Sequence, residues 1–325
     1  MSSDITGGIF GIWGSSGTNV FAVGNFNGGA PYACGKICYF DGSSWTQVST
    51  CAWYVLRGIW GTSETDVFAV GGNDFNGVDF HNQGIILHYN GTSWDTMIQG
   101  TLNLNAIWGS SGNDVFAVGG ISNCGLNCPN NIGKILHYNG VSWAEMSVDA
   151  GVLFGVAGIT GNDVFAVGRS GAIVHYDGSS WSAMSSGATQ DLYGIWANEG
   201  DDVFAVGKSG SILHYDGSSW SAMTSGTTQD LNAVWGSSGS DVFAVGGGGT
   251  ILHYDGSAWT AMTSGSSSPL AGVWGSSSSD VFAVGDQTIL HYDDSPDTNP
   301  PTGANSGGGY GCFITTAAYG SFLFE

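Results

Sequence analysis

Histidine and carboxylate side chains are the groups of this sequence that could do chemistry, and the histidines recur at regular spacing. One histidine falls in each of six copies of a repeat: His88, His137, His175, His214, His253 and His291. A metal ion needs several ligands in direct contact with it, so histidines spread one to a repeat cannot share an ion. We therefore expect structural hydrogen bonds from these rings, with no metal site and no cofactor.

The acidic residues do not form a catalytic pattern either. Most of the 26 Asp and Glu residues fall in repeated Asp-Gly and Ser-x-Asp turns, whereas a glycosidase needs two carboxylates paired across one bond. No nucleophile elbow, phosphate-binding loop or metal triad is present. We predict that the chain is not an enzyme.

The charge balance excludes two classes of partner. Five Lys and Arg residues stand against 26 Asp and Glu, which gives a net charge of −21. Nucleic acid and anionic membranes both require clustered cations, so neither is expected to bind. No apolar run is long enough to span a membrane, and no signal peptide is visible at the start. The acidic composition, rich in Gly, Ser and Thr, suggests an extracellular or cell-surface protein.

One hexapeptide, Asp/Asn-Val-Phe-Ala-Val-Gly, occurs seven times and sets the architecture. Its copies begin at residues 19, 66, 114, 163, 202, 241 and 280. Spacings of about 40 residues are typical of propeller blades or helical arrays. Residues 231–262 contain four short β runs separated by turn residues, which argues against helices. The sequence therefore predicts an all-β, seven-bladed β-propeller with four antiparallel strands in each blade.

Repeated residues acquire structural roles in this fold. Both faces of the second strand are apolar, as blades stacked on both sides require. We expect the glycine that ends this strand to take a positive φ, and the Asp-Gly that follows the third strand to close a hairpin. Tryptophans of the first and fourth strands should fill the wedges between blades. Blade 4 carries Ala157 at the first of these positions and should be looser there.

The last repeat lacks its fourth strand. It runs through residues 288–294 and is followed by a Pro/Gly-rich linker at 295–311 and a β-capable segment at 312–325. The spacing of Met1 to Trp13 equals that of Met223 to Trp235, which places Met1 at the end of a fourth strand. We predict a propeller at 1–294 whose last blade has an open edge, and open edges accept further strands.

Two motifs resemble known families. The turn His-Tyr-Asp-Gly-Ser-Ser-Trp is similar to the Asp-box of bacterial propellers, and the repeat as a whole resembles the propellers of photosystem assembly factors. The resemblance covers about residues 9–293 and implies the fold alone. Sialidases, which also carry Asp-boxes, grip a carboxylate with three arginines, whereas this chain has only Arg57 and Arg169. The segment beginning at Cys312 resembles the CFI-box of bacterial surface or secreted proteins, which suggests sorting or anchoring.

From these features we predict a non-catalytic extracellular structural protein. Its C-terminal segment would lie on an open blade edge, either its own or that of a neighbour, and the second case would give a homo-oligomer or filament. The residues of the assembly segment are Cys312, Phe313, Ile314, Tyr319 and Phe322. The oligomer stoichiometry and the identity of any ligand stay open.

The alternative is a recognition module for a glycan or a surface protein. Blades 1 to 3 carry long insertions between the second and third strands, at 25–36, 72–84 and 120–134, and loops of this kind often bind partners. Candidate aromatic contacts in and beside these insertions are Tyr32, Trp53, Tyr54, Phe75 and Phe80. These aromatic side chains could equally pack the loops against the propeller.

The six cysteines favour an oxidising compartment. If Phe40 pairs with Trp45, Cys34 lies opposite Cys51, which predicts a cross-strand disulfide. Cys124 and Cys128 could bridge within the third insertion. Cys38 takes the place of a core leucine and is expected as a buried thiol, while the pairing of Cys38 and Cys312 stays open.

Overall fold

The computed structural model contains twenty-seven β-strands within the residues that it describes. These residues are 8–26, 34–51, 54–73, 83–121, 132–198, 202–286 and 288–293. Within this part of the chain, no helix is long and apolar enough to cross a membrane.

The strands follow the order of the sequence repeats, and each repeat forms one sheet. Blade 1 consists of β1 (Ile9–Ser16), β2 (Asn19–Phe26), β3 (Cys34–Phe40) and β4 (Trp45–Cys51). Blade 2 consists of β5 (Val55–Ser63), β6 (Asp66–Gly72), β7 (Gly84–Tyr89) and β8 (Trp94–Thr101). Blade 3 consists of β9 (Leu104–Ser111), β10 (Asp114–Ile121), β11 (Ile132–Tyr138) and β12 (Trp143–Met146).

The remaining blades have shorter second strands. Blade 4 consists of β13 (Leu153–Thr160), β14 (Asp163–Gly168), β15 (Ile173–Tyr176) and β16 (Trp181–Ala183). Blade 5 consists of β17 (Leu192–Ala197), β18 (Val203–Gly207), β19 (Ile212–Tyr215) and β20 (Trp220–Met223). Blade 6 consists of β21 (Leu231–Ser238), β22 (Asp241–Gly246), β23 (Ile251–Tyr254) and β24 (Trp259–Met262). Blade 7 consists of β25 (Leu270–Ser277), β26 (Asp280–Gly285) and β27 (Thr288–Asp293).

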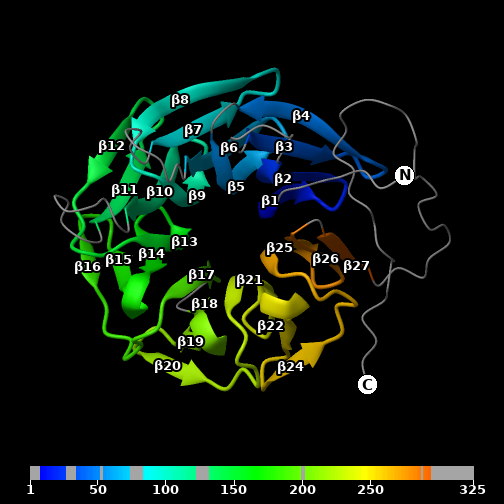
Figure 1. The fold of residues 1–325 in the computed structure, drawn as a ribbon. Coiled ribbons are helices and arrows are strands. Elements are labelled where there is room, and N and C mark those ends of the chain that lie inside the picture. Colours follow the sequence, from blue (N-terminus) through cyan, green and yellow to red (C-terminus); the bar gives the residue numbers. More distant parts are fainter. Residues whose placement is uncertain are drawn as a thin grey trace.

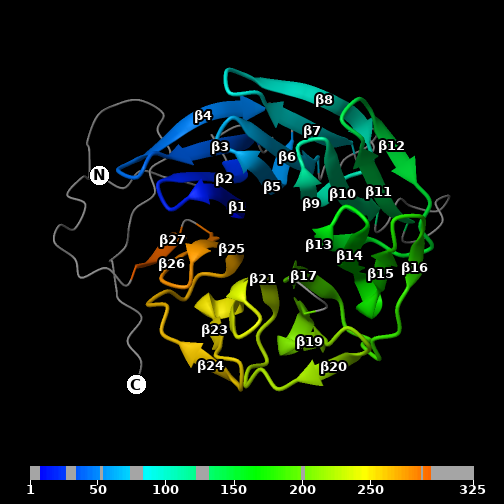
Figure 2. The ribbon, with the colours of Figure 1, turned by 180° about the vertical axis from the view of Figure 1, so that it is seen from behind.

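The seven sheets stand around a central axis and close a ring (Figure 1). The first strand of each blade lies innermost and the fourth outermost, and the view from behind shows the same order (Figure 2). Every pairing within a blade is antiparallel, for example β21 with β22 and β22 with β23. The predicted all-β seven-bladed propeller is therefore confirmed, with a last blade of three described strands.

The core is divided into seven apolar clusters, one at each contact between blades. Val20 and Ala22 of β2 join the cluster shared with blade 7, whereas the alternate residues Phe21 and Val23 join the cluster shared with blade 2. The other blades divide their second strands in the same way. The prediction that this strand is apolar on both faces is confirmed, because each face packs against a different neighbour.

The tryptophans of the first strands fill the wedges by lying on a glycine of the next blade. A Cβ atom added to Gly14 would lie 2.6 Å from the Trp274 ring, so only glycine fits beneath it. The contacting pairs are Trp13 with Gly61, Trp60 with Gly109, Trp108 with Gly158, Trp196 with Gly236, Trp235 with Gly275, and Trp274 with Gly14. The pair that includes the last and first blades closes the ring.

Blade 4 has Ala157 at the tryptophan position, and its neighbour compensates. Blade 5 carries Ala197 where the other blades have the glycine, and both alanines belong to the cluster between blades 4 and 5. Two alanines thus replace the tryptophan and glycine that meet at this contact between other blades. The loosening expected from the sequence is offset by the methyl group of Ala197.

The glycine that ends each second strand does not have a positive φ, which corrects the prediction. Gly168, Gly207 and Gly246 are extended, with φ of −167°, −171° and −172°. Glycine is required at these positions because no space is left for a side chain. A Cβ added to Gly168 would lie 2.2 Å from the carbonyl oxygen of Val152. The chain entering the first strand passes too close for any side chain.

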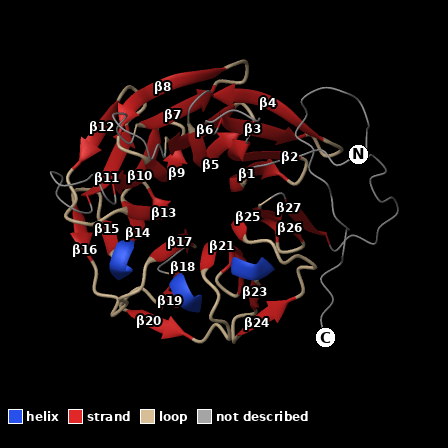
Figure 3. Ribbon diagram, viewed as in Figure 1, coloured by secondary structure: helices blue, strands red, loops and turns tan. Residues whose placement is uncertain are grey.

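Positive φ occurs instead inside the three-residue 3-10 turns η1 (Arg169–Gly171), η2 (Lys208–Gly210) and η3 (Gly247–Gly249). These turns follow the second strands of blades 4 to 6 and appear as the helices in Figure 3. The Asp-Gly hairpins are confirmed: the glycine has φ near +88° at Gly178 and Gly256.

The predicted register of the third and fourth strands of blade 1 is off by one residue. Phe40 does pair with Trp45, but a bulge leaves Val48 unpaired, so that Cys51 lies opposite Gly35 rather than Cys34. Cys38 is 1% exposed and disulfide-bonded, which corrects the expectation of a buried thiol. The side chains of the other five cysteines lie outside the described residues, so the two proposed bridges stay predictions.

Candidate binding site

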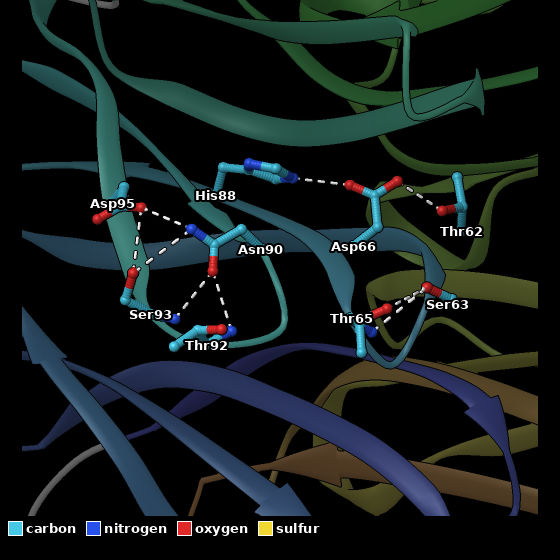
Figure 4. Close-up of polar contacts among 9 residues, drawn as sticks. All are labelled: Thr62, Ser63, Thr65, Asp66, His88, Asn90, Thr92, Ser93 and Asp95. Carbon is cyan, nitrogen blue, oxygen red and sulfur yellow. Dashed lines mark hydrogen bonds and ion pairs between the residues drawn. The ribbon is translucent and has the colours of Figure 1, made fainter.

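The recurring histidines make hydrogen bonds within the blades, as predicted. Each ring nitrogen Nε2 lies 2.6 or 2.7 Å from the aspartate that begins the repeated Asp-Val-Phe-Ala-Val-Gly hexapeptide of the same blade. Figure 4 shows this contact between His88 and Asp66, whose other carboxylate oxygen accepts a hydrogen bond from Thr62. Blade 1 has a different but matched pair, in which the Tyr39 hydroxyl donates to Asn19.

This hydroxyl–Asp–His arrangement does not form a catalytic triad. In a triad the histidine stands between the hydroxyl and the carboxylate, so that it can take the hydroxyl proton. Here the carboxylate stands in the middle, and the hydroxyl of Thr62 donates to Asp66 rather than to His88. Among the described residues, no group of three possible metal ligands comes together.

The cavity that the seven first strands enclose is the candidate site. It has a volume of about 490 Å³ and lies on the propeller axis. Two rings of its wall are apolar: each first strand contributes a small residue followed by isoleucine or valine, as in Gly11 and Ile12 or Gly155 and Val156. These positions scarcely change between blades and form an apolar surface.

At one position of the cavity wall, the type of side chain changes from blade to blade. This position is occupied by the residue that follows the repeated Ile or Leu of each first strand, and its members are Phe10, Arg57, Asn105, Phe154, Tyr193, Asn232 and Ala271. We call these seven residues the axial ring. Residues on either side of them along the strands repeat closely, so the scaffold does not require this variation. Side chains that vary on a constant scaffold are suited to recognition.

Aromatic side chains line two parts of the axial ring. Phe154 and Tyr193 make an edge-to-face contact, with centroids 5.7 Å apart and planes at 63°. Phe10 comes from blade 1, across the ring from blades 4 and 5 (Figure 1), and is 36% exposed. An apolar side chain entering the cavity would therefore meet aromatic rings on opposite sides.

Polar side chains occupy three further positions of the axial ring, Arg57, Asn105 and Asn232, and Ala271 occupies the seventh. The side-chain amides of Asn105 and Asn232 donate to the carbonyl oxygens of Leu153 and Leu270, at 2.8 and 2.7 Å. Each bond joins one blade to the next and fixes the orientation of the asparagine. Arg57 is the cation of the ring. The cavity thus combines an apolar interior with a few oriented polar groups, as ligand-binding cavities do.

Two aspartates, Asp191 and Asp230, lie close enough to Tyr193 for their charges to act on its hydroxyl. The carboxylates of Asp191 and Asp230 accept hydrogen bonds from the backbone N–H groups of Ser170 and Ser209, at 2.7 and 2.8 Å. Burial, with the negative charges of Asp230 and Asp191, raises the pKa of Tyr193. Its hydroxyl is therefore protonated at neutral pH and can donate a hydrogen bond.

Most of the site residues expected from the sequence lie outside the described residues. These are Tyr32, Trp53, Phe75 and Phe80 of the loop region and Cys312, Phe313, Ile314, Tyr319 and Phe322 of the assembly segment. Tyr54 is described and is 6% exposed. Its hydroxyl accepts a 2.7 Å hydrogen bond from Gln99, so this aromatic packs the propeller.

The axial ring was not among the sites predicted from the sequence, although the sequence contains a signal for it. Aligning the seven first strands on Ile9, Leu56 and their equivalents shows one column that varies from Phe to Arg to Asn. The insertions of blades 1 to 3 differ from the other blades in length, whereas this column differs only in residue type and is a weaker signal.

Comparison with known proteins supports the fold. No family model matches the chain, and no curated protein matches it. Among solved structures, YCF48 bound to a D1 peptide is similar with a TM-score of 0.66 at 15% identity, covering 90% of this chain and 95% of that one. YCF48 from Cyanidioschyzon merolae has a TM-score of 0.62 at 14% identity, over 90% and 97%. The WD40 propeller domain of Doa1 has a TM-score of 0.65 at 11% identity, over 90% and 93%.

Proposed function

We propose that this propeller is a non-catalytic recognition module that binds a segment of a partner protein at the axial ring. The observation that carries the proposal is the variation of these seven positions on an otherwise repeated scaffold. An apolar or aromatic side chain of the partner would enter the cavity between Phe10 and the Phe154–Tyr193 pair. The similar propeller YCF48 has been solved with a peptide bound, which is in keeping with this use of the fold.

The polar members of the axial ring would orient the segment. The Tyr193 hydroxyl can donate to a backbone carbonyl, while Arg57 favours a carboxylate or carbonyl oxygen. Asp191 and Asp230, whose charges act on Tyr193, favour a basic residue beside the inserted side chain, and the net charge of −21 acts in the same direction. We therefore expect a segment with a central apolar residue flanked by Lys or Arg.

Selection from a library of linear peptides tests this function. Peptides selected on the whole protein should lose at least about tenfold in affinity for the double variant Phe154→Ala, Tyr193→Ala, because two aromatic contacts are removed. The matched control is Val141→Ala, a change at a side chain that is 87% exposed in a turn of blade 3. Equal binding by wild type and double variant would refute the axial site.

Self-association remains a second candidate, and the three-stranded blade 7 is the observation that favours it. In that case the C-terminal segment of one chain would lie on the open edge of a neighbour, at the cell surface or outside the cell. Glycan binding by the loop aromatics of blades 1 to 3 stays a prediction. Light scattering on the full chain at increasing concentration would detect a polymer, and a constant monomer mass would refute self-association.

A further inference from the structure

The outer edge of blade 7 differs from that of the other six blades. β27 pairs with β26 on one side, and among the described residues no strand pairs with its other side. The six complete blades carry their fourth strand at this position. An exposed row of backbone N–H and C=O groups is a template for a further strand.

The residues of this edge specify what would fit on it. Ile289–Tyr292 has the same sequence, Ile-Leu-His-Tyr, as the third strands of blades 5 and 6. In those blades the tyrosine lies opposite a tryptophan, the leucine opposite an alanine and the isoleucine opposite a methionine. The edge of blade 7 therefore suits a strand with an aromatic residue, two small residues and a long apolar residue in that order.

The aromatic residue has the largest contact in the complete blades. Trp259 of blade 6 stacks on Tyr254 with centroids 5.3 Å apart, and it meets Phe204 of blade 5 edge-on at 6.1 Å. Phe243 is the corresponding phenylalanine of blade 6, and the described residues include no tryptophan against it. An aromatic side chain arriving from outside blade 7 would make this contact.

Apolar residues of blade 7 are less covered than their equivalents. Val281 is 5% exposed, whereas the matching valines of the other six blades are 0% exposed. Leu290 is 9% exposed, against 2% for Leu252 of blade 6. A fourth strand would remove this surface from water and add stability.

The chain itself contains two segments of the required pattern. Tyr310-Gly-Cys-Phe313 and Tyr319-Gly-Ser-Phe322 each place an aromatic residue three positions before a large apolar one, with small residues between. In blade 6 the four residues 255–258 suffice to connect the third strand to the fourth. Residues 294–309 provide 16 residues before Tyr310, a reach of about 50 Å.

We propose that the edge of β27 is a strand-acceptor site whose occupant is the tail of the same chain, with the tyrosine of one Tyr-Gly-x-Phe segment in the place of the missing tryptophan. A tethered segment has an effective concentration in the millimolar range, so it binds its own blade in preference to that of a second molecule. The site is separate from the axial ring and does not depend on the function proposed for it.

Amide hydrogen exchange on the full chain tests the proposal. Replacing the tyrosine that occupies the site should speed exchange of the β27 amides at least about tenfold. The variants are Tyr310→Ala, Tyr319→Ala and the double variant, and Phe324→Ala is the control because it lies outside both patterns. We expect one single variant and the double variant to lose protection, and the control to keep it.

A gain-of-contact variant separates strand docking from a general effect of the tail. Changing the occupying tyrosine to tryptophan should slow exchange of the β27 amides beyond the wild type, since tryptophan is the residue that complete blades use. Unchanged exchange in the double alanine variant would overturn the proposal. A rise of molecular mass with concentration that the double variant abolishes would also overturn it, because the tail would then occupy a second molecule.

Discussion

At the scale of single residues, two contacts of the repeat change in matched pairs. Where the first strand of blade 4 has Ala157 in place of tryptophan, blade 5 has Ala197 in place of glycine. Where blade 1 has Tyr39 in place of histidine, it also has Asn19 in place of aspartate. In each case the two residues fit each other rather than the consensus, which shows that contact geometry determines them.

The first pair gives a double-mutant prediction. Ala157→Trp alone should destabilise the protein by roughly 1–3 kcal/mol, because the indole would overlap the Ala197 methyl. Adding Ala197→Gly should recover most of that loss, although Ala197→Gly alone should be slightly destabilising. Urea unfolding of the four proteins measures the coupling, and additive effects would contradict the account.

Hydrogen bonding in the Asp-Gly turns predicts a dependence on pH. The hydroxyl groups of Ser43, Ser179 and Ser257, with nearby backbone N–H groups, lower the pKa of Asp41, Asp177 and Asp255 from 3.8 to about 2. A carboxylate with a lowered pKa in the folded chain stabilises the fold above its unfolded pKa. That contribution is lost as the pH falls from about 4 through 2.

A triple variant tests this contribution, with Asp41, Asp177 and Asp255 each changed to Asn. Blades 2 and 3 already form the same turn with Asn90 and Asn139, whose side chains accept the same backbone hydrogen bonds. We expect the fall in Tm between pH 4 and pH 2 to be smaller in the triple variant. An unchanged fall would show that other groups govern acid unfolding.

At the scale of the structural element, the second strand and its terminal glycine could be predicted only in part. Alternating Val, Phe, Ala and Val predicted a strand buried on both faces, because periodicity alone determines which face each residue occupies. The reason for Gly168 could not be predicted, because the carbonyl of Val152 that excludes a side chain belongs to a different part of the chain. The bulge at Val48 was missed for a similar reason, since one extra residue leaves no mark on composition.

Glycines with different roles should therefore respond differently to alanine. Gly168→Ala would force a Cβ against the Val152 carbonyl and should cost more than 2 kcal/mol through backbone displacement. Gly187 has φ of +69° and open space around it, so Gly187→Ala should cost only about 1 kcal/mol of conformational strain. Thermal unfolding of both variants compares them, and equal losses would contradict the steric explanation.

At the scale of the whole molecule, seven similar blades were predictable because spacing and turn residues repeat along the chain. The axial cavity followed from the ring, but its recognition surface did not, since seven residues far apart in sequence meet only when the ring closes. Tyr54 differs from its sequence-based expectation. Its place beside a long insertion suggested a binding residue, but its side chain is buried and hydrogen-bonded to Gln99 within the propeller.

Net charge also acts on the whole molecule. At −21, the protein should attract a basic segment over distances comparable to the Debye length, which is about 8 Å at 0.15 M salt. We expect the association rate with a selected basic peptide to fall severalfold between 0.05 and 0.5 M salt, with little change in the dissociation rate. Stopped-flow fluorescence measures both, and an association rate independent of salt would argue against a basic partner.

Hydrogen exchange of the propeller with and without a selected peptide tests the central claim most directly, because it locates bound segments by strand. The axial site predicts slower exchange where β1, β13 and β17 begin, at residues 9–11, 153–155 and 192–194, with the outer strands unaffected. Protection confined to the outer strands or to the loops of blades 1 to 3, with none at the axial ring, would contradict it.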